Sequence, residues 1–299
     1  MQIEIDPSAA SDTFAHRYLF QILAKIDDGW HVWQTALESD LIAIKTSTWI
    51  TRNGDQGKRV RELLEQSVKR SSWMSSNGRC VRVTTQPNST EADELMPRDA
   101  AKLAEEQLVI LVENRISDGN FVKRIVELLD PSLHKYWTQE GNPIRFDSLG
   151  GKGEMANHVR GQANDKPYRP RLVTIIDSDR TKPEDEASSE AKRLLSVCQG
   201  QQIPCWILAK REAENYLPKI LLENLETRSN DHANMIQQWD MLSDDHKDFC
   251  DMKQHFHNRK LDKCWTLENV KNAEDVKVEL VSRSQGDLER GISLIKEAV

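Results

Sequence analysis

The sequence predicts an α/β protein in which a parallel sheet is covered by helices on both faces. Two observations carry this prediction: the chain contains short, continuously apolar runs, and an amphipathic segment with helical spacing follows each of them. Apolar strands that alternate with helices are typical of parallel strands buried on both sides. We place this domain at residues 105–225, and its expected strands are 107-QLVILVE-113, 143-PIRF-146, 171-RLVTIID-177 and 204-PCWIL-208.

Each expected helix of this domain follows a strand. The clearest is 118–129, in which five apolar residues recur at the spacing that places them on one helix face: Phe121, Val122, Ile125, Leu128 and Leu129. The other helices are expected at 150–161, 184–198 and 214–225. These four helices supply the cover that a parallel sheet requires on its two faces.

The N-terminal region, residues 1–104, is expected to be mostly helical. Ser11 is a suitable N-cap for a helix over 12–26, whose apolar residues recur at helical spacing. A second helical pattern covers 55–70, and a short strand follows at 80–84. We find no internal repeat in the sequence.

The C-terminal region, residues 226–299, is also expected to be helical. It is polar and rich in charge, and Gly286 marks a turn late in the segment. The closing stretch 287–299 has the pattern of an amphipathic helix. Both flanking regions are candidates for homodimer formation or for docking a partner protein.

Composition predicts a soluble, cytoplasmic protein that does not enter a membrane. Of its 299 residues, 38% are hydrophobic and 30% are charged. The longest apolar runs fall far short of the roughly 20 residues that span a bilayer, and the first residues lack the features of a signal peptide. Five scattered cysteines favour reduced thiols over disulfides. A net charge of −7 gives no general attraction to nucleic acid, although a local basic patch or a bound metal can reverse the field at one site.

Charged side chains gather where three of the four expected strands end. The carboxyl ends of parallel strands meet at one edge of a sheet, and ligands bind at that edge. These side chains are therefore expected to converge. They are Glu113 and Asp118 after the first strand, Asp177 and Asp179 after the third, and Lys210, Glu212 and Glu214 after the fourth.

Convergence is what distinguishes this set from ordinary helix caps. A single acid after a strand is often the N-cap or a first-turn residue of the next helix, and this alternative applies to Asp118 and Glu214. Glu113, Asp177 and Asp179 together are harder to explain in that way, because clustered carboxylates repel one another. A hard divalent cation offsets the repulsion, and oxygen ligands suit Mg²⁺ or Mn²⁺. The cluster therefore predicts a site for one or two such ions.

The order of these residues resembles the TOPRIM domain, the metal-binding module of topoisomerases, bacterial primases, recombination mediators and OLD-family nucleases. The resemblance is closest to the OLD-like nucleases and to the standalone TOPRIM proteins that are paired with ATPases in phage-defence systems such as PARIS. It implies a Rossmann-like TOPRIM fold. Asn114 replaces the usual glycine of the family, and Asp118 comes one residue later than is common. The resemblance is carried by 109-VILVENRISDGNFV-122, 172-LVTIIDSD-179 and 207-ILAKREAENYLP-218.

The resemblance implies metal-dependent cleavage of phosphodiester bonds in DNA or RNA, tRNA included, by an antiviral effector. Glu113, Asp177 and Asp179 would hold a divalent ion that polarises the phosphate and activates water. Asp118 or Glu214 would hold a second ion. The resemblance also implies an ATPase partner that restrains the activity.

Basic groups are expected to contact the phosphates of the substrate. Lys210 would stabilise negative charge in the transition state, and the alternative for this residue is a surface lysine paired with Glu214 at the i,i+4 spacing. The other candidates are the segment 166-KPYRPR-171, Lys152 in the loop 150-GGKG-153, and Arg180 with Lys182.

Two further hypotheses remain open. The segment 173-VTIIDSDRT-181 also fits the first motif of haloacid-dehalogenase-type phosphatases, in which Asp177 would be a nucleophile and Asp179 a general acid. That fold normally opens with this strand, whereas here a strand that ends in Glu113 precedes it. The other hypothesis is a non-catalytic TOPRIM-like subunit that binds metal or nucleic acid, or regulates a partner.

Overall fold

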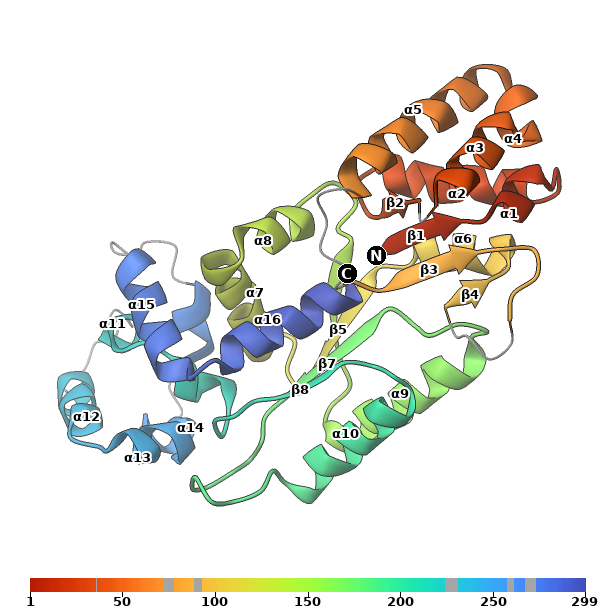
Figure 1. Ribbon diagram of the computed structural model, residues 1–299. Coiled ribbons are helices and arrows are strands. Elements are labelled where there is room, and N and C mark those ends of the chain that lie inside the picture. The colour runs from red at the N-terminus through yellow and green to blue at the C-terminus, as the bar shows by residue number, and fades with distance from the viewer. Residues whose placement is uncertain (36, 72–77, 89–92, 224–230, 257–260, 267–272) are drawn as a thin grey trace.

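The computed structural model of the chain describes residues 1–35, 37–71, 78–88, 93–223, 231–256, 261–266 and 273–299. Within these residues the chain forms two four-stranded parallel sheets with helices packed around them, so the protein is α/β (Figure 1). No helix in the described ranges is both long enough and apolar enough to cross a membrane.

The second sheet contains all four strands that the sequence predicts. Every neighbouring pair is parallel, with Leu111 opposite Thr174 and Thr174 opposite Cys205. All four carboxyl ends therefore lie at one edge of the sheet. The strands are β5 (Leu108–Val112), β6 (Ile144–Ser148), β7 (Leu172–Ile176) and β8 (Cys205–Ile207), in the spatial order β6-β5-β7-β8.

Helices cover both faces of this sheet, because its strands present apolar side chains in both directions. Ile110 of β5 shares one core cluster with Phe121 and Ile292, whereas its neighbour Leu111 shares another with Met155 and Leu194. The three layers are consistent with the Rossmann-like fold that was predicted (Figure 1). The covering helices are α7 (Ser117–Leu129) and α16 (Asp287–Ala298) on one face, and α9 (Lys152–Asp165) and α10 (Ser189–Gly200) on the other.

The C-terminal helices belong to the same domain as the second sheet. Trp239, Phe256 and Leu280 join the core cluster of β5 and β7. The helical content agrees with the sequence, and so does the turn at Gly286, whose φ of 86° suits glycine. The remaining elements of this domain are α8 (Pro131–Trp137), η1 (Ala213–Tyr216), α11 (Lys219–Glu223), α12 (Asp231–Asp240), α13 (Asp244–Phe249), α14 (Met252–His255), η2 (Leu261–Thr266) and α15 (Ala273–Ser284).

The N-terminal region is rich in helix, as expected, but it is built around a parallel sheet that the sequence analysis did not predict. Only β3 corresponds to an expected strand. The other strands are two to four residues long, which is too short to show a hydrophobic period. The strands are β1 (Gln2–Ile5), β2 (Val32–Gln34), β3 (Cys80–Val83) and β4 (Glu94–Leu95), in the order β2-β1-β3-β4.

Ser11 is not the N-cap that was predicted for the first long helix. A short helix begins earlier, because Asp6 caps it by accepting a hydrogen bond from the Ser8 N–H at 2.8 Å, and Ser11 is the last residue of that helix. The following helix begins only at His16. The helices of this region are α1 (Pro7–Ser11), α2 (His16–Asp27), α3 (Glu38–Thr46), α4 (Thr48–Thr51), α5 (Gly54–Ser71) and α6 (Pro97–Glu105).

The two sheets share one topology. In each, the first strand is central and pairs in parallel with the second strand on one side and the third on the other, and the fourth lies beyond the third. The fold therefore repeats a four-stranded unit, although the sequence analysis found no repeat. Parallel pairing and burial can be satisfied by many apolar sequences, so a shared topology need not leave a shared sequence pattern.

Gly291 of α16 is expected to be necessary for the packing of this helix on the sheet. A Cβ at this position would lie 2.4 Å from the ring of the fully buried Trp206. Gly291→Ala should therefore lower the free energy of unfolding by roughly 1–3 kcal/mol, as measured by urea denaturation. The matched control is Gly161→Ala in α9, where nothing lies within 4 Å and alanine should be neutral or stabilising. Equal losses in both variants would contradict this packing constraint.

Candidate functional site

The predicted carboxylates lie at the carboxyl edge of the second sheet. Glu113 directly follows β5, and Asp177 directly follows β7. The parallel pairing of these strands places the two residues side by side, and the Asp177 N–H donates to Glu113 Oε1 at 3.3 Å. Beyond β8, the Ala213 N–H donates to Asp177 Oδ1 at 3.1 Å. Three strand ends therefore meet here, as the sequence predicted.

The turn between β5 and α7 holds Asp118 beside this edge. Its carboxylate accepts hydrogen bonds from the Asn114 N–H and the Ser117 hydroxyl, both at 2.8 Å. Asn114, which stands where the TOPRIM family usually has glycine, accepts bonds from the N–H groups of Ile116 and Ser117 through its side chain. Asparagine thus stabilises the turn by bonding to the backbone two and three residues ahead. The longer spacing still brings Asp118 near enough for its charge to act on Asp177.

The 3-10 helix η1 supplies Glu214, of which only 3% is exposed. This short helix is fixed by the residues on either side of Glu214. The Glu212 N–H donates to Asn215 Oδ1 at 3.0 Å in a capping box. Asn215 also donates to the carbonyl oxygens of Lys247 and Cys250, which anchors η1 to the C-terminal helices.

The carboxylates of this edge, which we call the acidic cluster (Glu113, Asp118, Asp177 and Glu214), repel one another. Burial raises the pKa of Asp177 well above its usual value, and the charges of the other three members raise it further. Burial also raises the pKa of Glu113 and of Asp118. The pKa of Glu214 is raised to about 7 by burial, against the opposing charge of Lys253. Shifts of this kind are concentrated at functional sites.

Two lysines, Lys152 and Lys253, place positive charge among these carboxylates. Lys152 Nζ lies 3.1 Å from Glu113 and also contacts Asp179. Lys253 Nζ lies 3.2 Å from Glu212 and 3.6 Å from Glu214. Burial disfavours both ammonium charges, but the carboxylates outweigh it and raise the pKa of each lysine. The glycine loop brings Lys152 here: Gly151, with a φ of 130°, adopts a backbone conformation that suits glycine and immediately precedes α9.

Asp179 lies at the rim of the site. Its backbone has a φ of 57°, in the left-handed region that aspartate tolerates better than most residues. The Asp179 N–H donates to the carbonyl oxygen of Arg211 at 3.1 Å, which ties the end of β7 to the segment after β8. Its side chain is 48% exposed, so it is far more open to a ligand than Glu214.

The side chains of this edge fit a hard cation in their chemistry. All are carboxylates, which are the ligands that Mg²⁺ and Mn²⁺ prefer. Among the described residues, however, no three His, Cys, Asp or Glu side chains are grouped closely enough to hold an ion as they stand. The carboxylates contact the two lysine ammonium groups instead. Glu113, Asp177 and Asp179, with Asp118 or Glu214, are the residues that would hold the ion.

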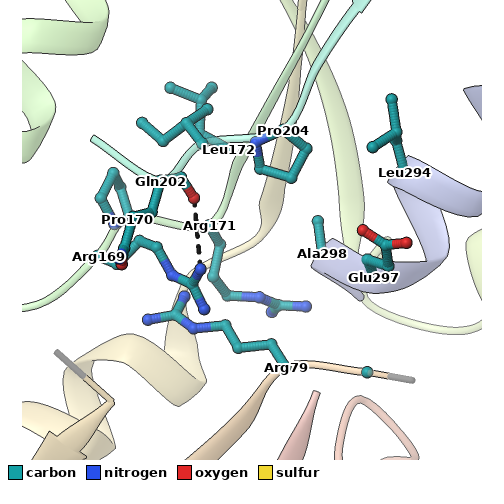
Figure 2. A pocket seen from close by; sticks show the side chains of 12 residues that line it. Arg79, Arg169, Pro170, Arg171, Leu172, Gln202, Pro204, Leu294, Glu297 and Ala298 are labelled. Carbon is teal, nitrogen blue, oxygen red and sulfur yellow. Dashed lines mark hydrogen bonds between the residues drawn. The ribbon is translucent and has the colours of Figure 1, made fainter. Parts of the chain in front are cut away.

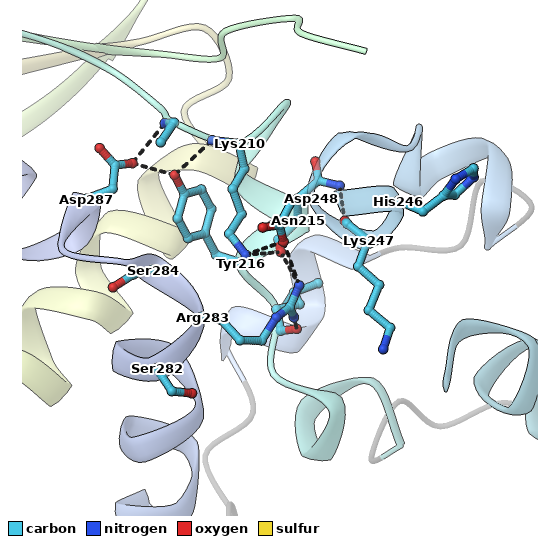
Figure 3. A network of polar contacts seen from close by, with 12 residues as sticks. Lys210, Asn215, Tyr216, His246, Lys247, Asp248, Ser282, Arg283, Ser284 and Asp287 are labelled. Atoms are coloured by element: carbon cyan, nitrogen blue, oxygen red, sulfur yellow. Dashed lines mark hydrogen bonds and ion pairs between the residues drawn. The ribbon is translucent and has the colours of Figure 1, made fainter. Parts of the chain in front are cut away.

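Lys210 lies apart from the acidic cluster. Its buried Nζ pairs with Asp248 at 2.5 Å and donates to the carbonyl oxygen of Asn215 at 3.5 Å. Arg283 shares the same Asp248 oxygen at 3.1 Å, and Figure 3 shows Lys210 directed toward this pair. The alternative pairing of Lys210 with Glu214 is not seen among the described residues, where Glu214 lies beside Lys253 instead.

The other basic candidates divide between the two edges of the sheet. The segment 166–171 leads into β7 and therefore lies at the amino edge, away from the acidic cluster, contrary to its predicted role. Arg180 lies at the carboxyl edge, where its guanidinium stacks 4.8 Å from the ring centre of Phe249 and donates to the carbonyl oxygen of Ala209. Lys182 pairs with Glu184 at 3.4 Å in the same loop.

The sequence analysis missed Lys253, Asp248 and Arg283. Each lies in the helical C-terminal region and reaches the site, or the network beside it, only through tertiary packing. Their spacing from the strand ends carries no periodic signal. The one available hint was the concentration of charge in residues 226–299.

Comparisons with protein-family models, with curated proteins and with solved structures found no match to this chain. The function of this edge must therefore be argued from its side chains.

Asp177→Asn is expected to stabilise the protein in the absence of metal. The change removes one of the repelling charges and keeps Oδ1 as an acceptor for the Ala213 N–H. The free energy of unfolding in EDTA at pH 8 should rise by about 1–2 kcal/mol, as measured by chemical denaturation. Added Mg²⁺ should stabilise the wild type more than this variant. Asp165→Asn, at the exposed end of α9, is the matched control and should change little. A loss of stability on Asp177→Asn would count against the repulsion.

Lys210 should give the protein a distinctive pH dependence. Burial lowers its pKa from 10.5 to about 8, aided by the charge of Arg283. Between these two values the unfolded chain binds the proton and the folded protein has released it, so the free energy of unfolding should rise with pH across that window. The contribution should reach roughly 3 kcal/mol. Urea denaturation at pH 7.5, 9 and 10 should show this rise in the wild type and a smaller one in Lys210→Met. Parallel profiles would mean that Lys210 keeps its proton throughout.

Proposed function

We propose that the protein is a metal-dependent nuclease of the TOPRIM type that cleaves phosphodiester bonds in DNA or RNA, tRNA included, as an antiviral effector. The observation that carries the proposal is the convergence of Glu113, Asp118, Asp177 and Glu214 from three strand ends into one partly buried, mutually repelling group. Such a group opposes folding unless positive charge is placed within it. Its position at the ligand-binding edge of a parallel sheet favours a functional reason for that strain.

Different residues of this edge would carry out different parts of such a reaction. A bound Mg²⁺ or Mn²⁺ would polarise the scissile phosphate and lower the pKa of a water molecule. The acidic cluster and Asp179 supply oxygen ligands, and backbone N–H bonds to Glu113, Asp118 and Asp177 hold their carboxylates in place. Lys152 and Lys253 place positive charge where the phosphate would bind, which is the role that the sequence analysis gave to Lys210. An ATPase partner that restrains the activity is supported by the resemblance alone.

A second candidate is a non-catalytic TOPRIM-like subunit. One observation favours it: in the described residues Glu113 pairs with Lys152 and Glu214 with Lys253, and no group ready to hold a metal is present. The ammonium groups of these two lysines can take the place of a divalent cation among the carboxylates. The edge would then have a structural role or would bind a partner. The two candidates differ in whether the protein cleaves phosphodiester bonds under Mg²⁺ or Mn²⁺, because a non-catalytic subunit could still bind the metal.

Glu113→Ala should abolish nuclease activity. Removing a ligand and leaving the ion poorly held should lower the cleavage rate by about a hundredfold or more. The assay is incubation of the purified protein with plasmid DNA, single-stranded RNA and tRNA under Mg²⁺, Mn²⁺ or EDTA, with and without any ATPase encoded beside it. Toxicity of the wild type and the variant in cells gives a second readout.

Glu65→Gln, on the exposed face of α5, is the matched control and should cleave like the wild type. Activity that survives Glu113→Ala would mean that the metal site is misassigned. Hydrolysis of a phosphomonoester, lost on Asp177→Asn alone, would favour the phosphatase hypothesis. No cleavage in any condition, whether or not Mg²⁺ binds, would favour the non-catalytic subunit.

A further inference from the structure

A cavity of about 450 Å³ opens at the amino edge of the second sheet, where this sheet meets the first. It is separated from the acidic cluster by the length of the strands. Arg79 enters it just before β3, and the segment 169–172 enters it where β7 begins. Gln202 to Pro204 line it before β8, and the last turns of α16 close the remaining side (Figure 2).

Three arginines dominate this cavity, and Figure 2 shows their guanidinium groups close together. Arg79 and Arg171 are only 8% and 2% exposed. One carboxylate contacts the group: Asp93 lies 2.8 Å from Arg79 and 2.7 Å from Arg169. Glu297 faces the cavity from α16 and forms no ion pair within the described part of the chain. Three buried or half-buried positive charges are thus matched by one paired carboxylate.

Arg171 is the least compensated of the three. No carboxylate in the described ranges contacts it, and its guanidinium donates only to the carbonyl oxygen of Glu106 at 2.6 Å and to the Tyr136 hydroxyl at 3.4 Å. The Nε atoms of Arg169 and Arg171 are buried without a hydrogen-bond partner among the described residues. These two N–H groups are therefore available to donate to an anion in the cavity.

The neighbouring positive charges affect the pKa of Arg79. Burial lowers the pKa of Arg79 to about 10, and the charges of Arg169 and Arg171 add to that effect against the opposing pull of Asp93. An anion in the cavity would reverse the repulsion and supply acceptors to the unused donors. Guanidinium groups bind phosphate in a bidentate manner, which makes arginine the usual choice for this ligand.

Apolar side chains form one wall of the cavity. Leu172, Ile203, Pro204 and Leu294 line the side away from Arg79. The volume falls within the range of about 300–1,000 Å³ that is typical of small-molecule sites. A cavity of this size with a cationic end and an apolar wall suits a compact ligand that carries both a phosphate and an apolar group. A nucleic acid strand would need an open groove instead.

We propose that this arginine cavity binds a small phosphorylated ligand of nucleotide size. Its phosphates lie against Arg79, Arg169 and Arg171, and its base packs on Pro204 and Leu294. The ligand would contact β3 of the first sheet, the starts of β7 and β8 and the end of α16, so binding would hold these elements together. The site is independent of the acidic cluster and requires no divalent metal.

The test is calorimetric titration of the full chain with ATP, ADP, AMP, inorganic phosphate and adenosine, in EDTA so that the acidic cluster cannot bind through metal. At least one nucleotide should bind at least tenfold more tightly than phosphate or adenosine. A nucleotide at a hundred times its Kd should raise the melting temperature by on the order of 5 °C. No nucleotide binding, or phosphate binding with no gain from the nucleoside, would overturn the proposal.

Two variants with opposite expected effects locate the binding. Arg169→Gln, at a half-buried position, should weaken nucleotide binding about tenfold or more. Glu297→Gln removes an exposed carboxylate that faces the cavity and should tighten binding severalfold. Glu113→Ala should leave the affinity unchanged. Affinity that does not respond to Arg169→Gln and Glu297→Gln would place the ligand elsewhere and refute the assignment.

Discussion

Parallel pairing between β5 and β7 determines where each charged group of the second sheet lies. Because the two strands run in the same direction, the side chains that follow them must meet at one edge, and the Asp177 N–H bonds to Glu113 there. The residues that precede the strands must meet at the other edge, where Arg171 enters the arginine cavity. One backbone constraint thus separates an acidic edge from a basic edge, and the two proposed sites, one for a cation and one for an anion, lie at opposite ends of the same strands.

The parts of the fold that the sequence could predict are those whose residues form a clear apolar pattern. Strands β5 to β8 lie between helical patterns and within apolar runs, which was sufficient to predict them. Strands β1 (QIEI), β2 (VWQ) and β4 (EL) are short and carry polar residues, so no apolar run marks them. Lys210 was placed by assuming that the chain after β8 stays at the cluster. In the structure, Lys210 pairs with Asp248 of the C-terminal helices. Partners separated by nearly forty residues cannot be found from local spacing.

The acidic cluster persists because the backbone and two lysines restrain it. Each of Glu113, Asp118 and Asp177 accepts a backbone N–H, which lowers the cost of holding a charge out of water. Lys152 and Lys253 arrive from elements on different sides of the cluster, α9 and α14. These devices reduce the repulsion without removing it, since the pKa of Asp177 stays well above its usual value. That remaining repulsion is what a divalent cation would relieve.

The first sheet also carries carboxylates toward the carboxyl ends of its strands, and there an arginine within the sheet pairs with them. Glu4, Asp6 and Glu94 gather there, and Arg82 of β3 pairs with Asp6 at 2.6 Å while lying 3.6 Å and 3.5 Å from the other two. Burial opposes the charge of Asp6, yet bonds from Ser8 and Arg82 outweigh it and lower its pKa. In the second sheet, β7 occupies the position that β3 occupies in the first. The sequence of β7, LVTII, contains no arginine that could pair with the carboxylates. The pKa shifts of Asp6 and Asp177 therefore have opposite signs at equivalent edges. Arg82 does not remove all of the strain in the first sheet, since burial and acidic neighbours still raise the pKa of Glu4. The pKa of Asp177, however, is raised well above its usual value, so the edge of the second sheet is the one whose repulsion a bound cation would relieve most.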